Sequence, residues 1–439
     1  MMGRTRIRGY PLFVPIPGRL KVIMIATEIQ NPAQDQTSKA WLLPYIITLL
    51  AMLTMMMSIM GYAPLTPQIV QEFRLSYTQL GLFTGAYGLM SIMLSVPAGM
   101  AVHKFTEKRV LFLGLVVSCI GIALFSRAIG FVTAFLSLIV WYAGFRFAFV
   151  GVLAALTFTC PPAWRGRSFG ILGAMSSIGV IIGAPFGGYI GKALGWRVAM
   201  IGFACVACVA AICFQFLYRR TVDEPGTPVH AEARAAHKRA QKSPFRMSRA
   251  WGLACVVGML GLPSFTITFF APSAGKMLFH LDGVTIGLML SAGYVCAVIV
   301  NLIGGYLMDR FDKMLVLFFI EVLMIPAALI MNLHSLPAFY ISAALIIALS
   351  FTATNLGYGL CGELRGSQTA NVVGMVSLGA GFFGYVGPQV LGVLRDVSGT
   401  FTAGWYFIAF ISAATAIGAL LLRRVHWDVA GAPAVEAVQ

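Results

Sequence analysis

Long apolar stretches separated by short polar gaps dominate the pattern of hydrophobic and polar positions along this chain. A helix needs about 20 consecutive apolar residues to cross the hydrocarbon layer of a membrane, and about twelve stretches of this kind occur. A membrane barrel would instead alternate apolar and polar residues over segments of about ten, and no such alternation is visible. The pattern therefore predicts an all-α membrane protein, with spans at residues 41–62, 77–102, 110–128, 131–158, 169–191, 197–218, 251–272, 284–307, 314–333, 336–360, 371–394 and 401–422.

Two charged junctions between spans repeat each other at half-chain spacing. Gly99 begins the junction GMAVHKFTEKRVL, and Gly305 begins GYLMDRFDKMLVL, 206 residues later. Gly81 and Gly287, one span upstream, keep the same spacing, so the register holds through a whole span. A charged junction that recurs between membrane helices is typical of a transporter body built from two related halves.

The repeat and the polar gaps divide the chain into five parts. We expect two halves of six helices each, joined by a basic, proline-containing linker and flanked by two polar tails. The parts are the N-terminal tail 1–40, the first half 41–218, the linker 219–250, the second half 251–424 and the C-terminal tail 425–439. Pro64 and Pro272 follow the first and seventh spans, and each predicts a break or kink there.

Composition agrees with a membrane protein, because 59% of the residues are hydrophobic and only 10% are charged. The net charge of +16 would favour a nucleic-acid partner if the basic residues formed a patch on a soluble domain. They gather instead in the tails, the linker and the even-numbered gaps, which predicts that both termini lie in the cytoplasm and excludes nucleic acid as a partner. No Asn-x-Ser/Thr acceptor occurs, which favours a bacterial inner membrane. The odd-numbered gaps hold only six basic residues, Arg74, Arg127, Lys192, Arg197, Lys276 and Arg395.

The second junction carries a known motif, Gly-x-Leu-Ala-Asp-Arg-x-Gly-Arg-Arg, which it matches at Gly305, Leu307, Asp309, Arg310 and Lys313. On these residues, repeated at matched positions, the chain resembles the major facilitator superfamily over residues 41–424. The resemblance implies twelve helices in two pseudo-symmetric six-helix halves. The first junction departs from the motif, because His103 stands where the family has an aspartate.

The resemblance also implies that these junctions act in gating. In the family, contacts between carboxylate and guanidinium groups hold two helices together in one state and release them in the other. Asp309, Arg310 and Lys313 can supply such contacts in the second half, and Arg109 keeps a cation in the first. His103 leaves two interpretations open, a latch that depends on imidazole charge or a loop that has drifted from the motif.

Glycine and proline recur in the fifth and eleventh spans. The fifth resembles the family's antiporter-associated motif, with Ala184 in place of the glycine before the proline. Glycines at spacing four make a smooth helix face, so we expect packing and hinge roles. The residues concerned are Gly183, Pro185, Gly187, Gly188 and Pro388. The sequence Gly379-Ala-Gly-Phe-Phe-Gly fits a dinucleotide-binding pattern, but it lies inside an apolar helix, and we expect no cofactor.

Two formal charges fall deep within predicted spans, Arg146 in the fourth and Glu321 in the ninth. An ionised group at that depth costs at least a few kcal/mol, so it needs a partner, a water-filled cavity or a function. Arg146 resembles the family's helix-4 arginine, and the resemblance places helix 4 at the central cavity. Two interpretations stay open, a substrate or coupling role and a structural arginine bound to helix-end carbonyls. For Glu321 we expect a neutral or internally paired carboxyl.

Shifting Arg146 by the half-chain spacing leads to Thr352 of the tenth span, which shares one helical face with Asn355 and Gly359. A cation in one half that faces neutral hydrogen-bonding groups in the other suits a small organic anion or a polar molecule with an apolar body. Tyr142, one turn from Arg146, adds an aromatic surface.

These patterns predict a secondary active transporter that moves a small molecule by alternating access. A small organic anion such as a monocarboxylate is the expected substrate, with a proton or an exchanged anion as coupling partner. We expect a monomer in a lipid bilayer, with no enzymatic activity and no metal. Two alternatives stay open, an efflux pump for lipophilic compounds and a non-transporting receptor or scaffold of the same fold.

Overall fold

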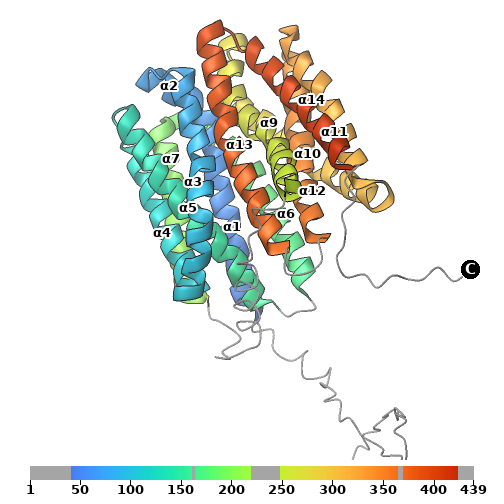
Figure 1. The fold of residues 1–439 in the computed structure, drawn as a ribbon. Coiled ribbons are helices and arrows are strands. Elements are labelled where there is room, and N and C mark those ends of the chain that lie inside the picture. The colour runs from blue at the N-terminus through green and yellow to red at the C-terminus, as the bar shows by residue number, and fades with distance from the viewer. Residues whose placement is uncertain (1–40, 161–163, 219–247, 364–368, 424–439) are drawn as a thin grey trace, which may run out of the picture. The chain divides into compact units, whose positions relative to one another are not determined.

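The computed structural model describes residues 41–160, 164–218, 248–363 and 369–423, and every structural statement below refers to these ranges. Twelve of their helices are long and apolar enough to cross a membrane, and no strand occurs among them (Figure 1). The all-α prediction is therefore confirmed. The helices are α1 (Leu42–Tyr62), α3 (Tyr77–Phe105), α4 (Glu107–Ser126), α5 (Phe131–Thr159), α6 (Arg165–Leu194), α7 (Trp196–Leu217), α9 (Ser248–Phe279), α10 (Gly283–Arg310), α11 (Lys313–Ile330), α12 (Leu336–Glu363), α13 (Thr369–Ser398) and α14 (Thr402–Arg423).

Short polar residues explain where several helices begin. Ser76 closes a capping box at the start of α3. The side chain of Asp282 accepts a hydrogen bond of 2.8 Å from the backbone N–H of Thr285 at the start of α10, and Asp312 caps α11 in the same way. Each cap satisfies a backbone donor that the first turn of a helix leaves without a partner. The short gaps between spans therefore suffice to end one helix and begin the next.

The prolines at the ends of the first and seventh spans act differently. Pro64 lies in a 3-10 turn, η2 (Ala63–Leu65), which joins α1 to the short helix α2 (Thr66–Phe73). In contrast, α9 continues through Pro272 as one helix, so the chain does not break there, and the alternative of a kink stays a prediction. The residues around Pro272 are buried, and packing against neighbouring helices holds a turn that lacks one backbone hydrogen bond.

Contacts between helices fall into two groups. Within the first six spans α4 packs on α5 and α1 on α6, and within the last six α13 packs on α9, α10 on α12 and α11 on α14. The most extensive contacts between these groups are those of α3 with α13 and of α6 with α10, while α2 also contacts α9 and η2 contacts both α9 and α10. Figure 1 shows α3 and α13 side by side. We refer to α1–α7 as the first half and to α9–α14 as the second half.

Glycine allows the close approach in both joining pairs. A Cβ atom on Gly88 of α3 would lie 2.5 Å from the carbonyl oxygen of Gly381 on α13. A Cβ atom on Gly287 of α10 would lie 2.5 Å from the carbonyl oxygen of Ala184 on α6. Any larger residue at Gly88 or Gly287 would collide with backbone, so these positions fix the spacing of the halves.

The glycines and prolines predicted to pack lie at the same interfaces and at the contact of α6 with α1. Gly183 and Gly187 face backbone of α1, whereas Gly188 faces backbone of α10. Pro185 of α6 lies against Gly287, and the carbonyl oxygen of Pro388 lies against α3. Small residues thus allow α6 to pack closely on two of its sides, against α1 and against α10.

The two halves meet at one end of the bundle, which we term the closed end. It holds the loops between α2 and α3 and between α9 and α10. Toward the opposite end, a Cβ atom on Gly170 or Gly173 of α6, or on Gly374 of α13, would meet no atom within 4 Å. The loops between α3 and α4 and between α10 and α11 lie at that end, which we term the open end.

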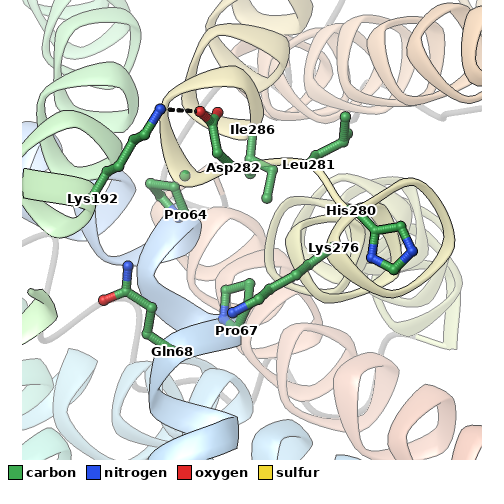
Figure 2. Close-up of a pocket in the computed structure, with 10 residues that line it drawn as sticks. Pro64, Pro67, Gln68, Lys192, Lys276, His280, Leu281, Asp282 and Ile286 are labelled. Carbon is green, nitrogen blue, oxygen red and sulfur yellow. Dashed lines mark hydrogen bonds and ion pairs between the residues drawn. The ribbon is translucent and has the colours of Figure 1, made fainter.

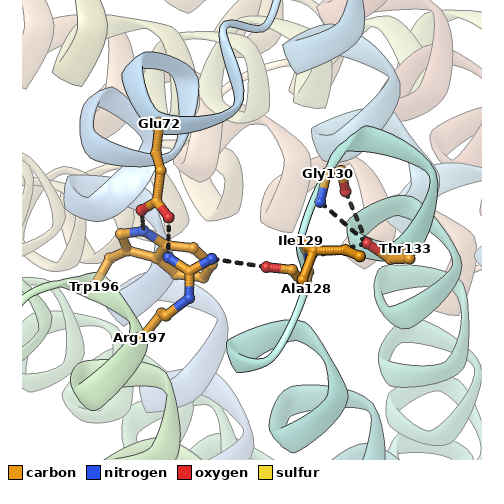
Figure 3. A network of polar contacts seen from close by, with 7 residues as sticks. All are labelled: Glu72, Ala128, Ile129, Gly130, Thr133, Trp196 and Arg197. Carbon is orange, nitrogen blue, oxygen red and sulfur yellow. Dashed lines mark hydrogen bonds and ion pairs between the residues drawn. The ribbon is translucent and has the colours of Figure 1, made fainter.

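A polar network ties the first half together at the closed end (Figure 3). The carboxylate of Glu72 on α2 accepts hydrogen bonds from the indole of Trp196 and the guanidinium of Arg197. Arg197 Nη2 also donates to the carbonyl of Ala128 at 2.7 Å. The network joins α2, the start of α7 and the loop between α4 and α5, so this end of the first half is braced as one unit.

Some predicted features fall outside the described residues. These are the tails at 1–40 and 425–439 and, apart from the start of α9 at Ser248, the linker at 219–250. The backbone of His103 belongs to α3, but the structure does not describe its side chain. The boundaries of the five parts and the role of His103 stay predictions.

Candidate functional site

Arg146 lies near the middle of α5 and is half-buried. Its Nε and Nη2 atoms both donate to the hydroxyl oxygen of Ser95 on α3, at 3.0 and 2.6 Å. The guanidinium carbon lies 5.7 Å from the centroid of the Phe149 ring. No described residue accepts a hydrogen bond from Nη1. The contacts with Ser95 and Phe149 therefore orient the guanidinium while leaving part of its donor fork for a ligand.

The positive charge of Arg146 has no counter-ion within the described ranges, where ion pairs form at Lys192, Arg197 and Arg423. Glu321 is fully buried on α11, which packs against α12 and α14 and not against α5. The hydrogen-bonding partner of Arg146 is a hydroxyl and not the helix-end carbonyls that a structural arginine would need. An unpaired cation at this depth favours an anionic ligand.

A layer of aromatic rings lies next to Arg146 on the side of the closed end. Tyr142, one turn from Arg146, is buried in it, and its ring stacks on that of Trp141 at 5.3 Å. The rings come from α1, α3, α5 and α9. The aromatic layer comprises Tyr62, Tyr87, Trp141, Tyr142, Phe145, Phe265 and Phe269.

Two ring pairs of this layer cross between the halves. Tyr87 of α3 stacks on Phe265 of α9 with centroids 5.0 Å apart and an angle of 21°. The ring centroids of Tyr62 on α1 and Phe269 on α9 are 5.8 Å apart. Such pairs contribute about 0.5–1.5 kcal/mol each beyond the burial of their area. The aromatic layer thus separates Arg146 from the closed end through contacts weak enough to part and re-form.

The two residues predicted on α12 occupy different environments. Thr352 is fully buried, and its hydroxyl donates to the carbonyl of Ala297 on α10 at 3.4 Å. Asn355 is exposed, and no described residue forms a hydrogen bond with its amide. Of the two, only Asn355 is available to a ligand in this conformation.

The residues predicted to act in gating lie at or near the open end. Asp309 and Arg310 are exposed at the end of α10, and the guanidinium of Arg310 lies 4.5 Å from the ring centroid of Tyr306 on its own helix. Lys313 is half-buried at the start of α11, and Arg109 is exposed on α4. Asp309 forms no ion pair with a described residue. This geometry matches an end at which the halves have moved apart.

Neighbouring polar residues tie the outer helices within each half. Asp312 before α11 accepts a hydrogen bond of 3.2 Å from Arg423 of α14. Lys108 of α4 donates to the carbonyl of Tyr218, just after α7, at 2.9 Å. The third and last spans of each half are thus joined in a related way. The motif did not indicate Asp312, because the family has glycine at that position.

Two polar contacts between the halves at the closed end were also missed from the sequence. Lys192 at the end of α6 pairs with Asp282 before α10 at 2.6 Å. Asp396, near the end of α13, accepts hydrogen bonds from the backbone N–H groups of Tyr77 and Thr78 at 2.9 and 2.8 Å. The sequence did single out Lys192, because it is one of only six basic residues in the odd-numbered gaps. Together the contacts hold the start of α3 and the start of α10 against the opposite half.

The described residues contain no group of three or more His, Cys, Asp or Glu side chains that could hold a metal ion. Their cysteines, including Cys205 and Cys208 on α7, are free thiols. The groups around Arg146 are the hydroxyl of Ser95 and aromatic rings.

Known proteins similar to this chain are transporters. The chain is 26% identical over 388 residues to the probable sulfoacetate transporter SauU of Cupriavidus necator, which covers 81% of this chain and 88% of the relative. It is 22% identical over 373 residues to the probable nitrate transporter NarT of Staphylococcus epidermidis, with 82% and 91% covered. It is 25% identical over 351 residues to multidrug resistance protein 1 of Bacillus subtilis, with 76% and 85% covered.

Solved transporter structures share the fold. A bacterial homologue of the human lysosomal transporter Spinster, in an inward-facing and unoccupied conformation, matches with a TM-score of 0.70 at 14% identity, covering 88% of this chain and 96% of that one. The nucleoside transporter NupG matches with a TM-score of 0.67 at 12% identity, covering 86% and 99%. The sequence model of the Major Facilitator Superfamily matches residues 48–364, most of the chain. The predicted twelve-helix architecture and the family resemblance are thereby confirmed, and the chain belongs to the Major Facilitator Superfamily.

Proposed function

We propose that this chain is a secondary transporter of a small organic anion, with Arg146 as the group that binds the anion during alternating access. The observation that carries the proposal is a half-buried guanidinium, oriented by the Ser95 hydroxyl, with no carboxylate partner among the described residues. A guanidinium offers a planar fork of donors that fits a carboxylate. The bound anion would supply the missing counter-charge.

The surroundings of Arg146 favour a ligand with a short carbon skeleton. Phe149 and Tyr142 present rings on either side of Arg146 along α5, and the amide of Asn355 is a candidate hydrogen-bonding group on the second half. A few polar groups among apolar walls are typical of small-molecule sites. Because the aromatic layer lies toward the closed end, the ligand would enter and leave from the open end in this conformation.

The relatives support an anion. One of them is named for sulfoacetate and another for nitrate, and both of these compounds are anions. Sulfoacetate carries a carboxylate and a sulfonate, two groups that match a guanidinium fork. We therefore propose small carboxylates and sulfonated carboxylates as the substrate class, with a proton or an exchanged anion as the coupling partner.

We also propose that the open end faces the cytoplasm of a bacterial cell, because basic residues concentrate in the gaps at that end. Ile129 in a closed-end loop and Phe311 in an open-end loop are exposed. Single cysteines at these positions, in a background without the eight native cysteines, test the orientation. A membrane-impermeant maleimide added to intact cells should label Ile129→Cys and spare Phe311→Cys. The reverse pattern would overturn the orientation.

An efflux pump for lipophilic compounds is the second candidate. The aromatic layer places ring surfaces from both halves beside Arg146, and such surfaces suit flat apolar molecules. Multidrug resistance protein 1 of Bacillus subtilis is also a relative. In this case the aromatic rings, and not the guanidinium, would provide most of the affinity.

Flux into liposomes that contain the purified protein separates the candidates. We expect uptake of small carboxylates or sulfonates that is lost in Arg146→Ala and kept in Arg127→Ala, a control that removes an exposed arginine from a closed-end loop. Transport of tetraphenylphosphonium without any anion flux would favour the efflux pump. Absence of flux for both classes would favour a receptor or scaffold.

A further inference from the structure

The closed end contains a pocket of about 390 Å³ with its own set of basic groups (Figure 2). It lies beyond the aromatic layer from Arg146, because Pro64 and Lys276 follow Tyr62 and Phe269 along their helices toward that end. Both halves contribute to its wall. From the first half come Pro64, Pro67, Gln68 and Lys192, and from the second Lys276, His280, Leu281, Asp282, Gly283 and Ile286.

Cations outnumber carboxylates around this pocket. Lys192 is paired with Asp282, but among the described residues the ammonium of Lys276 donates only to the neutral side-chain oxygen of Gln71, at 3.2 Å. The charge of Asp282 is shared further, because its carboxylate also caps the start of α10. Lys276 therefore contributes a positive charge that no carboxylate of the pocket balances.

His280 stands at the edge of the pocket in an unusual backbone conformation. Its φ angle is 54°, in the left-handed region that is sterically unfavourable for a residue with a Cβ atom. The N–H of His280 bonds to the carbonyl of Lys276, and the N–H of Leu281 bonds to that of Gly275, in a helix C-terminal cap. Glycine commonly occupies this position in such caps. A histidine there adds an imidazole to the pocket wall next to Lys276.

We propose that this pocket is a second anion-binding site, in which a small free anion with carboxylate or sulfonate groups bridges Lys192 of the first half and Lys276 of the second. Because the bridge joins the halves, its occupant binds the closed-end conformation more tightly than one in which the two lysines have separated. Occupancy therefore favours that conformation. The site uses different residues from those at Arg146, so either proposal can fail without the other.

Binding of malonate, a small dicarboxylate, tests the site. All variants carry Arg146→Ala, which removes the proposed transport site from the measurement. Nanodiscs made only of phosphatidylcholine contain no anionic headgroups, so titration calorimetry in them reports the free anion. We expect Lys276→Gln to weaken malonate binding at least tenfold and Arg127→Gln, with the same loss of charge in a closed-end loop, to leave it unchanged. Lys276 is exposed, so its replacement preserves packing.

A second variant tests the other end of the bridge. Lys192→Gln removes the cation that the first half contributes, so it should also weaken malonate binding. Equal affinity in Lys276→Gln and Arg127→Gln, or no binding in the Arg146→Ala background, would overturn the site. Binding that appears only after phosphatidylglycerol is added would also overturn it, because a lipid headgroup would then be involved. Unchanged malonate affinity in Lys192→Gln would contradict the bridge between the halves.

Discussion

The guanidinium of Arg146 donates two hydrogen bonds to one hydroxyl oxygen, that of Ser95, at 3.0 and 2.6 Å. The two residues belong to α5 and α3 of the same half, so their contact does not depend on how the halves are placed. A neutral hydroxyl orients the cation without neutralising it. The charge of Arg146 is thereby kept available to a ligand.

Replacing Arg146 by alanine should lower organic-anion flux about 10- to 100-fold, because a buried hydrogen bond to a charged group contributes roughly 1.5–3 kcal/mol. Arg146→Lys should restore part of the flux, since lysine keeps the charge but lacks the planar fork. Ser95→Ala should have a smaller effect, because it disturbs the orientation only. Flux in liposomes is normalised to folded protein measured by size-exclusion chromatography. Unchanged normalised flux in Arg146→Ala would exclude the residue from the site.

Gly88→Val should open the closed end, because a Cβ atom there would meet the backbone of Gly381 on α13. Spin labels at the exposed positions Ile129 and Val397 report the separation of the halves at that end. Double electron–electron resonance should show longer distances between the two spin labels in Gly88→Val than in the parent protein. Gly202→Val is the matched control, since a Cβ atom at Gly202 meets nothing within 4 Å. The same distance distribution in both variants would show that α3 and α13 do not need this close approach.

The ion pair between Lys192 and Asp282 predicts a closed end that opens in acid and is stable near neutrality. The hydrogen bond from Lys192, followed by those from Thr285, holds the pKa of Asp282 well below its usual range. A carboxyl whose pKa is depressed in one conformation stabilises that conformation above the pKa it has elsewhere, about 3.9. That stabilisation is lost as the pH falls through the depressed pKa. The pair is therefore fully effective between about pH 5 and 8 and weakens below about pH 4.

The same spin-label distances measure this pH dependence. We expect no change between about pH 5 and 8, longer distances toward pH 3, and no acid step attributable to this pair in Asp282→Asn. A step near pH 6 in the parent protein would contradict the assignment, because that is the range in which histidine titrates.

Asp312→Ala should destabilise the folded protein more than Asp309→Ala. Asp312 caps α11 and pairs with Arg423, whereas Asp309 is exposed and pairs with no described residue. Loss of a helix N-cap costs about 1 kcal/mol. Thermal unfolding in detergent, followed by the amount of monodisperse protein, should show a lower midpoint for Asp312→Ala alone. Equal midpoints would mean that the cap and the ion pair contribute little here.

The twelve helices could be predicted because the apolar length of a span is a local property of the chain. The span expected at residues 284–307, for example, is observed as α10. Contacts between distant spans, in contrast, are not indicated by any local sequence pattern. Asp396 reaches Thr78 across 318 residues, and nothing in the sequence around either residue indicates the pairing. Likewise, burial around Pro272, and not the proline itself, decides that α9 continues through it.

The candidate site was predictable only in part. Arg146 stands out because a charge deep in an apolar span is rare. The half-chain shift from Arg146 leads to α12, since the internal repeat relates whole helices. It does not determine the rotation of that helix about its axis, which side-chain packing sets. Thr352 is consequently buried against α10, while Asn355, three residues on, is exposed.

Asp396 of the second half caps α3 of the first half, so opening of the closed end is coupled to its hydration. When the halves part, the backbone N–H groups of Tyr77 and Thr78 lose their acceptor and must hydrogen-bond to water. Opening therefore adds bound water at these two backbone groups. Large osmolytes, which are excluded from protein surfaces, oppose such uptake, so the balance between the two conformations depends on the osmotic pressure at that face of the membrane.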